Sequence, residues 1–330
     1  MRSSELPDGA FDLLACPACG GELRRPALCA GCGAGYALDG GIPSLRLPAD
    51  ARTEAVREFY AQAPFPAYPP RDTYPWLRMR AERSEFARLL DEAIPCDARI
   101  LEMGCGTGQM SLFLATAGRL VIGADLSRPA LEVAEAARRR YGIERARFVE
   151  TDLRAPGLRR GAFDVVYSSG VLHHTPDPRA SFRAVAGLVR PGGMLVVGLY
   201  NAYARLPHRL RRGVARLTGF RWVPLDPVLR ERRAEPARRE AWLRDQYLHV
   251  EEHRHTLREV QGWFRENRVQ YLRAYPNTLL GAEPLRGNAL FDAAEDDWQL
   301  ENLVAQLSWA RSLAHEGGLF VVVGRAAAQA

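Results

Sequence analysis

The ten residues 99–108, RILEMGCGTG, constrain the fold more than any other stretch of the chain. A short apolar run around Ile100 and Leu101 leads to an acid, Glu102, and a turn with three glycines follows at once. Glycine takes positive φ readily and lets the backbone approach a ligand closely. The amphipathic segment 109–117 then predicts a helix whose first N–H groups are available to a polar ligand. The stretch therefore predicts a strand, a tight turn and a helix.

Further apolar runs follow at intervals and alternate with helical segments. They are typical of buried strands, and they lie at 119–124, 147–150, 163–169 and 194–200, with a helix expected at 131–141. Such alternation predicts a parallel sheet covered by helices, with ligands bound at the carboxyl ends of the strands. An acid about 20 residues beyond a glycine turn, as Asp125 is, is placed to accept hydrogen bonds from ribose hydroxyls. The polar residues at or just past the expected strand ends are Glu102, Asp125, Asp152, Ser168 and His173.

The order of motifs in 96–200 resembles that of the class I S-adenosylmethionine (SAM) dependent methyltransferases. EMGCGTG matches the first motif of that family and ADLS the second, and TDL, FDVVYSSGVLHH and RPGGMLVV follow in the family's order. The G-x-G-x-G turn lacks the G-x-G-x-x-G spacing of nicotinamide-binding Rossmann folds. The resemblance implies an α/β fold with a Rossmann-like seven-stranded sheet and helices on both faces. In that fold 269–275 and 317–326 would be the last two strands, paired with each other.

The resemblance also implies roles for single residues. Glu102 and the glycine turn would hold the methionine part of SAM, Asp125 the ribose, and Asp152 with the Leu153 amide the adenine. The residues expected to bind SAM are Glu102, Gly104, Cys105, Gly106, Gly108, Gln109, Asp125, Leu126, Asp152, Leu153, Ser168 and Ser169. The alternative is an α/β domain that binds no nucleotide and uses these residues as caps and turns.

Two histidines lie in the loop after the fourth expected strand. His173 or His174 could act as a general base for an acceptor oxygen or nitrogen. The alternative is that the pair only orders the loop. Alignment and desolvation of the reactants supply most of the rate enhancement in methyl transfer. The resemblance to methyltransferases therefore does not require a catalytic base.

Four cysteines near the N-terminus form two CxxC pairs separated by nine residues: Cys16, Cys19, Cys29 and Cys32. Four thiolates at this spacing can close a tetrahedral zinc site, and a site filled by four cysteines predicts a structural role. Two disulfides are the alternative, which the expected cytoplasmic location disfavours. The surrounding pattern resembles zinc-ribbon modules fused to or partnering methyltransferases, including some that modify ribosomal or transfer RNA.

The segment that follows the cysteines combines a helical stretch with prolines and aromatics. Residues 54–60 are expected to be helical, and 61–76 contain five prolines and four large aromatics. This segment could be a linker held on the core by Phe65, Tyr68 and Trp76, or a lid in which Tyr60 and Tyr68 reach a ligand. We expect a zinc-ribbon module at 1–48, this linker at 49–95, and a methyltransferase domain at 96–330 with helical insertions at about 203–266 and 283–315. The second insertion contains Trp298 and Trp309.

The first insertion is rich in arginine. Residues 205–239 contain eleven arginines, and LPHRLRRGVARLTGF places apolar residues at helical spacing with a basic opposite face. Such a helix could lie on RNA phosphates, an anionic membrane or an acidic substrate, or be a solvated face.

His249, Glu252 and His253 also fit the zinc-peptidase spacing H-x-x-E-H, which we discount because no third ligand is evident. The candidates for contact with a methyl acceptor are Tyr60, Tyr68, Tyr200, Asn201, Tyr247, His249 and His255.

Composition limits the remaining possibilities. The net charge is +6, and the chain contains no lysine, which excludes a lysine base or Schiff base. No run of 18 apolar residues and no secretory signal pattern occur, so we expect a cytoplasmic protein with no transmembrane segment.

We expect methyl transfer from SAM to an O, N or C atom of a small molecule. Methylation of ribosomal or transfer RNA is the alternative, although the first 50 residues carry only four arginines against six acids. A non-catalytic SAM-binding regulator is a third possibility, and the acceptor and the oligomeric state are not predicted.

Overall fold

The computed structural model describes residues 6–61, 68, 72–231, 235–249, 251–278, 285–294 and 299–328. Of the residues discussed above, Phe65 and Trp298 lie outside these ranges.

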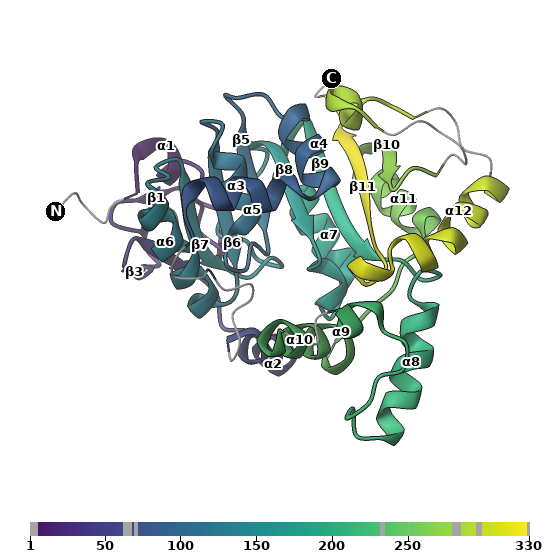
Figure 1. The fold of residues 1–330 in the computed structure, drawn as a ribbon. Coiled ribbons are helices and arrows are strands. Elements are labelled where there is room, and N and C mark those ends of the chain that lie inside the picture. The colour runs from purple at the N-terminus through teal and green to yellow at the C-terminus, as the bar shows by residue number, and fades with distance from the viewer. Residues whose placement is uncertain are drawn as a thin grey trace.

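A nine-stranded sheet forms the centre of the described chain, in the order β10-β11-β9-β8-β5-β6-β7-β4-β3 (Figure 1). The seven strands expected from the sequence are present, and two strands from the N-terminal segment extend them. The bounds are β3 Leu38–Asp39, β4 Ile42–Leu45, β5 Arg99–Met103, β6 Leu120–Asp125, β7 Ala146–Thr151, β8 Phe163–Ser169, β9 Val189–Tyr200, β10 Val269–Tyr275 and β11 Leu319–Ala326. Strands β4 to β9 pair in parallel where they adjoin, and β11 lies antiparallel to both β9 and β10. The carboxyl ends of β5 to β8 therefore meet at one edge.

Strand β9 begins earlier than expected. The sequence places the Pro-Gly-Gly motif before the strand, whereas β9 starts at Val189 and includes this motif. The ladder between β8 and β9 shifts register between Phe163 and Val165, and Gly192 has φ of +74°. A glycine in this conformation lets the strand bulge and continue.

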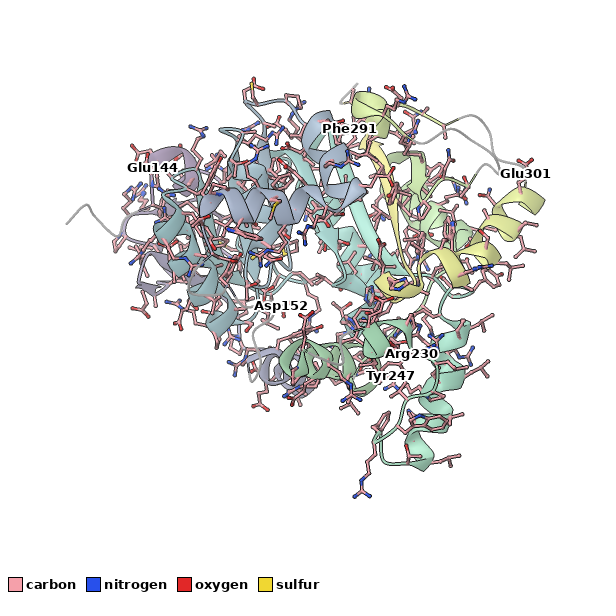
Figure 2. All side chains as sticks on the ribbon, viewed as in Figure 1. Glu144, Asp152, Arg230, Tyr247, Phe291 and Glu301 are labelled. Atoms are coloured by element: carbon pink, nitrogen blue, oxygen red, sulfur yellow. The ribbon has the colours of Figure 1, made fainter. Side chains whose placement is uncertain are left out.

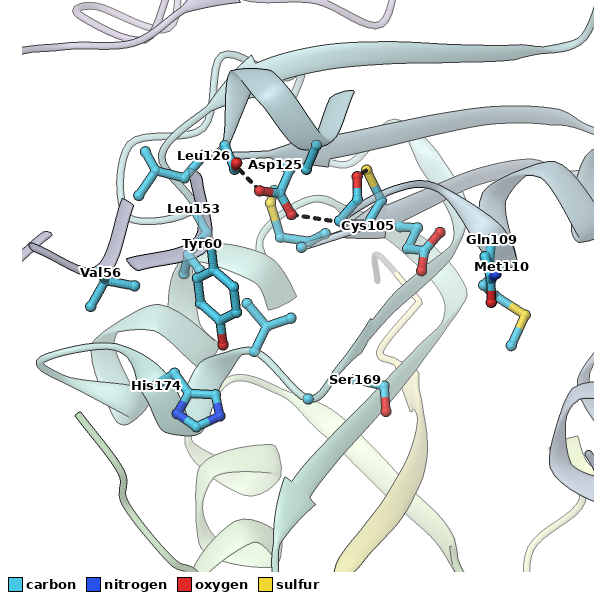
Figure 3. A pocket seen from close by; sticks show the side chains of 18 of the residues that line it. Val56, Tyr60, Cys105, Gln109, Met110, Asp125, Leu126, Leu153, Ser169 and His174 are labelled. Atoms are coloured by element: carbon cyan, nitrogen blue, oxygen red, sulfur yellow. Dashed lines mark hydrogen bonds between the residues drawn. The ribbon is translucent and has the colours of Figure 1, made fainter. Parts of the chain in front are cut away.

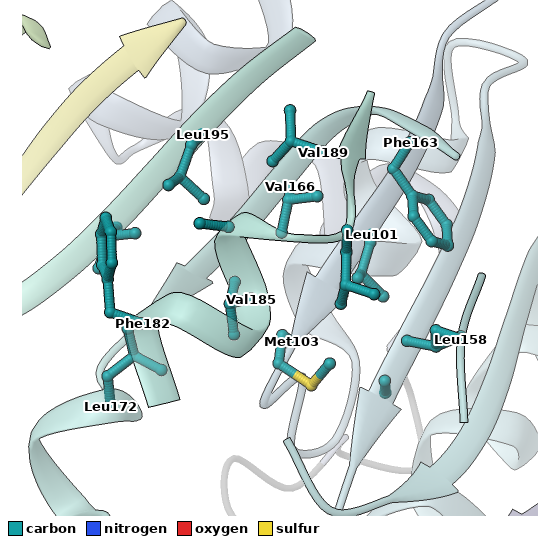
Figure 4. Packing of buried hydrophobic residues seen from close by; sticks show 14 of the residues in the cluster. Leu101, Met103, Leu158, Phe163, Val166, Leu172, Phe182, Val185, Val189 and Leu195 are labelled. Atoms are coloured by element: carbon teal, nitrogen blue, oxygen red, sulfur yellow. The ribbon is translucent and has the colours of Figure 1, made fainter. Parts of the chain in front are cut away.

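Helices cover both faces of the sheet, as expected. Successive strand residues point to opposite faces, so Leu101 and Ile100 enter different cores. The core around Leu101 includes Phe182 and Val185 (Figure 4), and the core around Ile100 includes Leu112. The helices on the first face are α7 Pro178–Ala186, α11 Leu257–Glu266 and α12 Gln299–Ser312. Those on the second are α3 Tyr74–Glu82, α4 Glu85–Ala93, α5 Gln109–Ala115 and α6 Arg128–Tyr141.

The N-terminal segment packs directly on the sheet. It contains α1 Asp8–Phe11 and a hairpin of β1 Leu23–Arg24 and β2 Leu28–Cys29. Its last strand, β4, pairs with β7 through Ser44 opposite Glu150 and Leu45 opposite Thr151. The division at residue 48 stays a prediction, and β4 joins the two expected parts in one sheet.

The first insertion lies between β9 and α11. It consists of α8 Leu206–Leu217, α9 Pro227–Glu231, α10 Pro236–Leu243 and a π-helical turn, η3, at Arg244–Leu248. Helix α2, Ala51–Ala61, contacts this insertion: the Arg52 guanidinium lies 2.7 Å from the Glu251 carboxylate, and the Arg244 guanidinium lies over the Phe59 ring. The segment 283–315 includes a 3₁₀ turn, η4 Gly287–Phe291, and α12, whose Trp309 packs on Phe320. None of the described helices has the length and apolar character needed to cross a membrane.

Candidate active site

The glycine turn after β5 has a left-handed backbone conformation that strongly favours glycine. Gly104, Gly106 and Gly108 have φ of +78°, +52° and +75°. A Cβ atom on Gly104 would clash with the Val171 side chain, and one on Gly108 would lie 2.7 Å from the Phe148 ring. Neighbouring side chains therefore fill the space that a Cβ atom would need at these two glycines. Because the glycines have no side chains, a ligand at the turn would contact its backbone.

Asp125 joins the turn to the next strand. One of its carboxylate oxygens accepts a hydrogen bond from the Gly106 N–H at 2.8 Å, and the other accepts one from the Ser127 N–H at 2.8 Å (Figure 3). Burial raises the pKa of Asp125 above its usual range, against the effect of these N–H groups. Each oxygen retains a lone pair that can accept a ligand hydroxyl.

Glu102 and Asp152 occupy the neighbouring strand ends and have different environments. Glu102 is buried and accepts a hydrogen bond from the Ser111 hydroxyl, and burial, with a contribution from the nearby Asp125 charge, raises its pKa to about 8. Asp152 accepts a hydrogen bond from the Arg154 N–H at 2.9 Å and pairs with its guanidinium at 3.0 Å. Burial therefore favours the neutral form of the Glu102 carboxyl group, whereas the Asp152 carboxylate has a cationic partner.

A cavity of about 520 Å³ lies at these strand ends (Figure 3). Many of the residues expected to bind SAM or the acceptor line it: Tyr60, Glu102, Gly104, Cys105, Gly106, Gln109, Asp125, Leu126, Asp152, Leu153, Ser169 and His174. The sequence did not single out several others, namely Val56, Arg57, Leu77, Arg80, Met110, Arg154, Val171 and Thr175. Burial raises the pKa of the Cys105 thiol well above its usual range, so this residue is a neutral part of the wall.

Residues 101–197, which supply most of this wall, match the family model described as a methyltransferase domain. This part of the chain is a methyltransferase domain. An uncharacterized protein of Synechococcus is 28% identical over 269 residues, which cover 71% of this chain and 64% of that protein. A ubiquinone biosynthesis O-methyltransferase of Xanthomonas axonopodis is 34% identical over 162 residues, 48% of this chain and 65% of that enzyme.

Solved structures of methyltransferases have a similar fold. Magnesium protoporphyrin IX methyltransferase from Synechocystis gives a TM-score of 0.49 at 14% identity, covering 83% of this chain and 99% of that one. A SAM-dependent methyltransferase from Mesorhizobium loti gives 0.47 at 20% identity, covering 74% and 99%. The chain spans less than two thirds of the length of the curated relatives given above.

Several expected site residues of the methyltransferase domain lie behind the cavity wall, in the part of the chain that the structure describes. Ser168 is fully buried, and its hydroxyl donates to the Met103 carbonyl at 2.9 Å within the sheet. Tyr68 donates to the Thr107 carbonyl at 2.8 Å, so both side chains support the glycine turn from outside. Gly108 belongs to the turn and caps α5.

Three of the expected acceptor contacts have partners within the insertion and its surroundings. Asn201 accepts hydrogen bonds from the Tyr203 and Ala204 N–H groups, and Tyr247 donates to Asp226 at 2.6 Å. The imidazole of His255 lies 3.0 Å from the Glu259 carboxylate. None of the three is among the described residues that line the cavity.

A series of contacting aromatic rings, tilted relative to one another, leads from the cavity into the core. The centroids of Tyr200 and His173 lie 3.9 Å apart, those of His173 and His174 4.3 Å, and those of His174 and His249 3.7 Å. His249 then contacts Tyr60, with ring centroids 5.4 Å apart. Of the two histidines proposed from the sequence, His174 lines the cavity and His173 lies behind it, fully buried.

The environment of His174 fixes its protonation. Burial, aided by the charge of Arg205, lowers the pKa of His174 to about 4, against the effect of a backbone hydrogen bond. Its Nδ1 lies 2.7 Å from the Glu251 carbonyl oxygen, which can only accept, so Nδ1 carries the proton. Nε2 is then the basic nitrogen of a neutral ring at pH 7. Burial also lowers the pKa of His173, whose two ring nitrogens have no hydrogen-bond partner among the described residues.

The four N-terminal cysteines lie together, with all four Sγ atoms within 4.8 Å of one another. The Sγ atoms of Cys16 and Cys32 are 3.7 Å apart, and those of Cys19 and Cys29 are 3.5 Å apart. Zn–S bonds of about 2.3 Å in a tetrahedron place sulfurs about 3.8 Å apart, so the donor set fits zinc. The site is positioned for a structural metal, because Cys16 and Cys29 also belong to the core against the sheet.

Proposed function

We propose that this chain is a SAM-dependent methyltransferase whose acceptor is a small molecule bound in the cavity. The observation that carries this proposal is the composition of the cavity wall. The wall combines the glycine turn, Asp125 and Asp152 with apolar side chains such as Val56, Leu77 and Met110. A cavity of about 520 Å³ with a few polar groups is typical of small-molecule sites.

The glycine turn and the carboxylates next to it fit SAM. A Cβ atom has no room at Gly104 or Gly108, so the turn presents backbone to a ligand. We assign the ribose hydroxyls to the Asp125 carboxylate, the adenine to Asp152 with the Leu153 N–H, and the methionine part to Glu102 and the turn. When bound, SAM supplies an electrophilic methyl group, which needs an acceptor atom in line with it.

His174, which also lines the cavity, is placed to remove a proton from the acceptor. Its ring is neutral at pH 7, lines the cavity and has Nδ1 held by the Glu251 carbonyl. We assign Nε2 as the general base for an acceptor hydroxyl. His173 is a positioning residue, because it packs against both His174 and Tyr200 and does not line the cavity.

The position of α2 supports a small acceptor over RNA. Asp50 caps the start of α2 and pairs with Arg154 at 2.7 Å, beside Asp152. Near the other end of the helix, Phe59 contacts His249, with ring centroids 4.8 Å apart. The helix is thus fixed at both ends beside the cavity, and Val56 and Tyr60 face into it. An RNA strand would require this helix to move, whereas a compact acceptor fits beneath it. The relative named as a ubiquinone biosynthesis O-methyltransferase supports an acceptor of this size.

The test uses SAM labelled in its methyl group, incubated with the full chain and a cell extract that is then separated into small metabolites, RNA and protein. We expect label in the small-molecule fraction, lost with Asp125→Ala and kept with Glu132→Ala, which removes an exposed carboxylate of α6. Nuclease-sensitive label in RNA would contradict the proposed acceptor. No label in any fraction, from protein that binds SAM, would contradict catalysis.

A further inference from the structure

Helix α8 carries an apolar stripe that faces away from the protein. Successive residues of an α-helix are 100° apart, so Leu206, Leu210, Val214 and Leu217 fall within an arc of about 80°. All four side chains are exposed, Leu210 by 75% and Leu217 by 87%. The buried residues of the helix, His208 and Ala215, lie on nearly the opposite side. This amphipathic helix therefore exposes its apolar stripe to solvent and does not bury it against the protein.

The stripe continues beyond the end of the helix. Trp222 and Leu225, in the turn that follows, are 59% and 75% exposed. Figure 1 shows α8 and this turn extending away from the sheet, so the apolar side chains lie on a projecting edge. Six large apolar side chains gathered on one projecting segment indicate a binding surface, because scattered single residues would be the ordinary case.

Arginines flank the stripe, and no acid interrupts them. Residues 201–225 contain six arginines and no Asp or Glu. Arg209, Arg216 and Arg221 are exposed and have no ion-pair partner among the residues that the structure describes. On the helix, Arg209 and Arg216 lie next to the stripe, where their long side chains can extend toward anionic groups while the leucines are buried.

We propose that α8 and the turn after it dock on an anionic membrane surface. Apolar side chains that include a tryptophan, with arginines at their border, are the composition of helices that lie in the interface of a bilayer. RNA offers phosphates but no hydrocarbon to bury the leucines. A second copy of this chain would bring two sets of unpaired arginines together across a symmetric interface. An anionic bilayer satisfies both the apolar and the basic part of the surface.

The test measures co-sedimentation of the full chain with large vesicles at low salt. One set of vesicles is phosphatidylcholine alone, and the other contains equal parts of phosphatidylcholine and phosphatidylglycerol. We expect binding to the second set, weakened by added salt. The double variant Leu210→Asp with Leu217→Asp should bind at least about a hundredfold more weakly, since each of the two buried leucines contributes about a factor of ten or more. Trp76→Asp is the matched control, because Trp76 is 53% exposed on α3, away from α8.

A second pair of changes tests the basic part. Arg209→Gln with Arg216→Gln should weaken binding to the anionic vesicles and reduce its dependence on salt. Thermal melting checks the fold of every variant, and no SAM or acceptor is present, so the result is independent of the proposed reaction. Wild-type protein that does not sediment with anionic vesicles would overturn the proposal, as would equal binding by the leucine variant. A dimer in light scattering that the leucine variant dissociates, without vesicle binding, would assign the surface to a second copy.

Discussion

At the scale of single residues, Asp125 is the side chain on which the cofactor site depends most. Its two oxygens hold the N–H groups of Gly106 and Ser127, so it fixes the geometry of the turn as well as facing the cavity. We expect Asp125→Ala to weaken SAM binding by at least about tenfold, because hydrogen bonds to a charged group are worth about 1.5–3 kcal/mol each. Calorimetry measures this, with Glu132→Ala as the control. Unchanged affinity in a folded variant would contradict the ribose assignment.

His174 is expected to act through its neutral ring. His174→Gln should lower kcat by about 10²-fold or more and leave SAM affinity within about twofold. Because the pKa of His174 is lowered to about 4, the rate should be flat from pH 6 to 8 and fall only as the pH approaches that value and the base becomes protonated. His315→Ala serves as the control, since this exposed ring pairs with Glu231 and does not line the cavity. A variant with full turnover would show that no base acts at this position.

The raised pKa of Glu102 should make the folded protein less stable as the pH rises. Its pKa of about 8 in the folded state lies above the ordinary value of 4.5. The folded protein then binds the proton more tightly than the unfolded chain does, so the stability from this group is present at low pH and is lost as the pH rises from 4.5 through 8. Without SAM, the melting temperature of the wild type should fall more between pH 6 and 9 than that of Glu102→Gln. Parallel curves for the two proteins would contradict the shifted pKa.

At the scale of elements, the N-terminal segment that contains the four cysteines is joined to the main sheet next to the candidate site. Strand β4 pairs with β7, and β7 ends at Thr151, directly before Asp152. We expect about one zinc per chain, because four thiolates make one tetrahedral site. Cys16→Ser with Cys29→Ser should release the metal and lower the melting temperature, while Cys96→Ser, at an exposed cysteine outside the cluster, should retain both. Metal analysis that finds no zinc in the wild type would remove the ribbon assignment.

The elements of the sheet could be predicted because their signals are local. Apolar runs that end in acidic or other polar residues located β5 to β8, and the three glycines of the turn predicted the positive φ that the structure shows. The start of β9 could not be predicted, since a Pro-Gly-Gly motif within a strand depends on a bulge against β8. The extension of the sheet by β4 and β3 was also missed, because pairing between β4 and β7 joins segments about a hundred residues apart.

At the scale of the whole molecule, the cavity is assembled from segments that local patterns do not connect. The motif residues Glu102, Asp125 and Asp152 were found from the sequence because each lies at or just past the end of a strand. The contact of Tyr60 with His249, and of His249 with His174, brings together three distant segments, and no periodicity indicates it. For the same reason Tyr247 and His255 were expected at the acceptor, whereas their hydroxyl and imidazole groups meet Asp226 and Glu259.

The proposed reaction requires SAM to lie between the glycine turn and the carboxylates of Asp125 and Asp152, with its reactive end toward His174. The most direct measurement is a crystal structure of the full chain with the product S-adenosylhomocysteine. We predict the ribose hydroxyls on Asp125, the adenine beside Asp152 and Leu153, and the sulfur facing the part of the cavity lined by His174 and Tyr60. A ligand bound elsewhere, or a sulfur directed away from His174, would contradict the account.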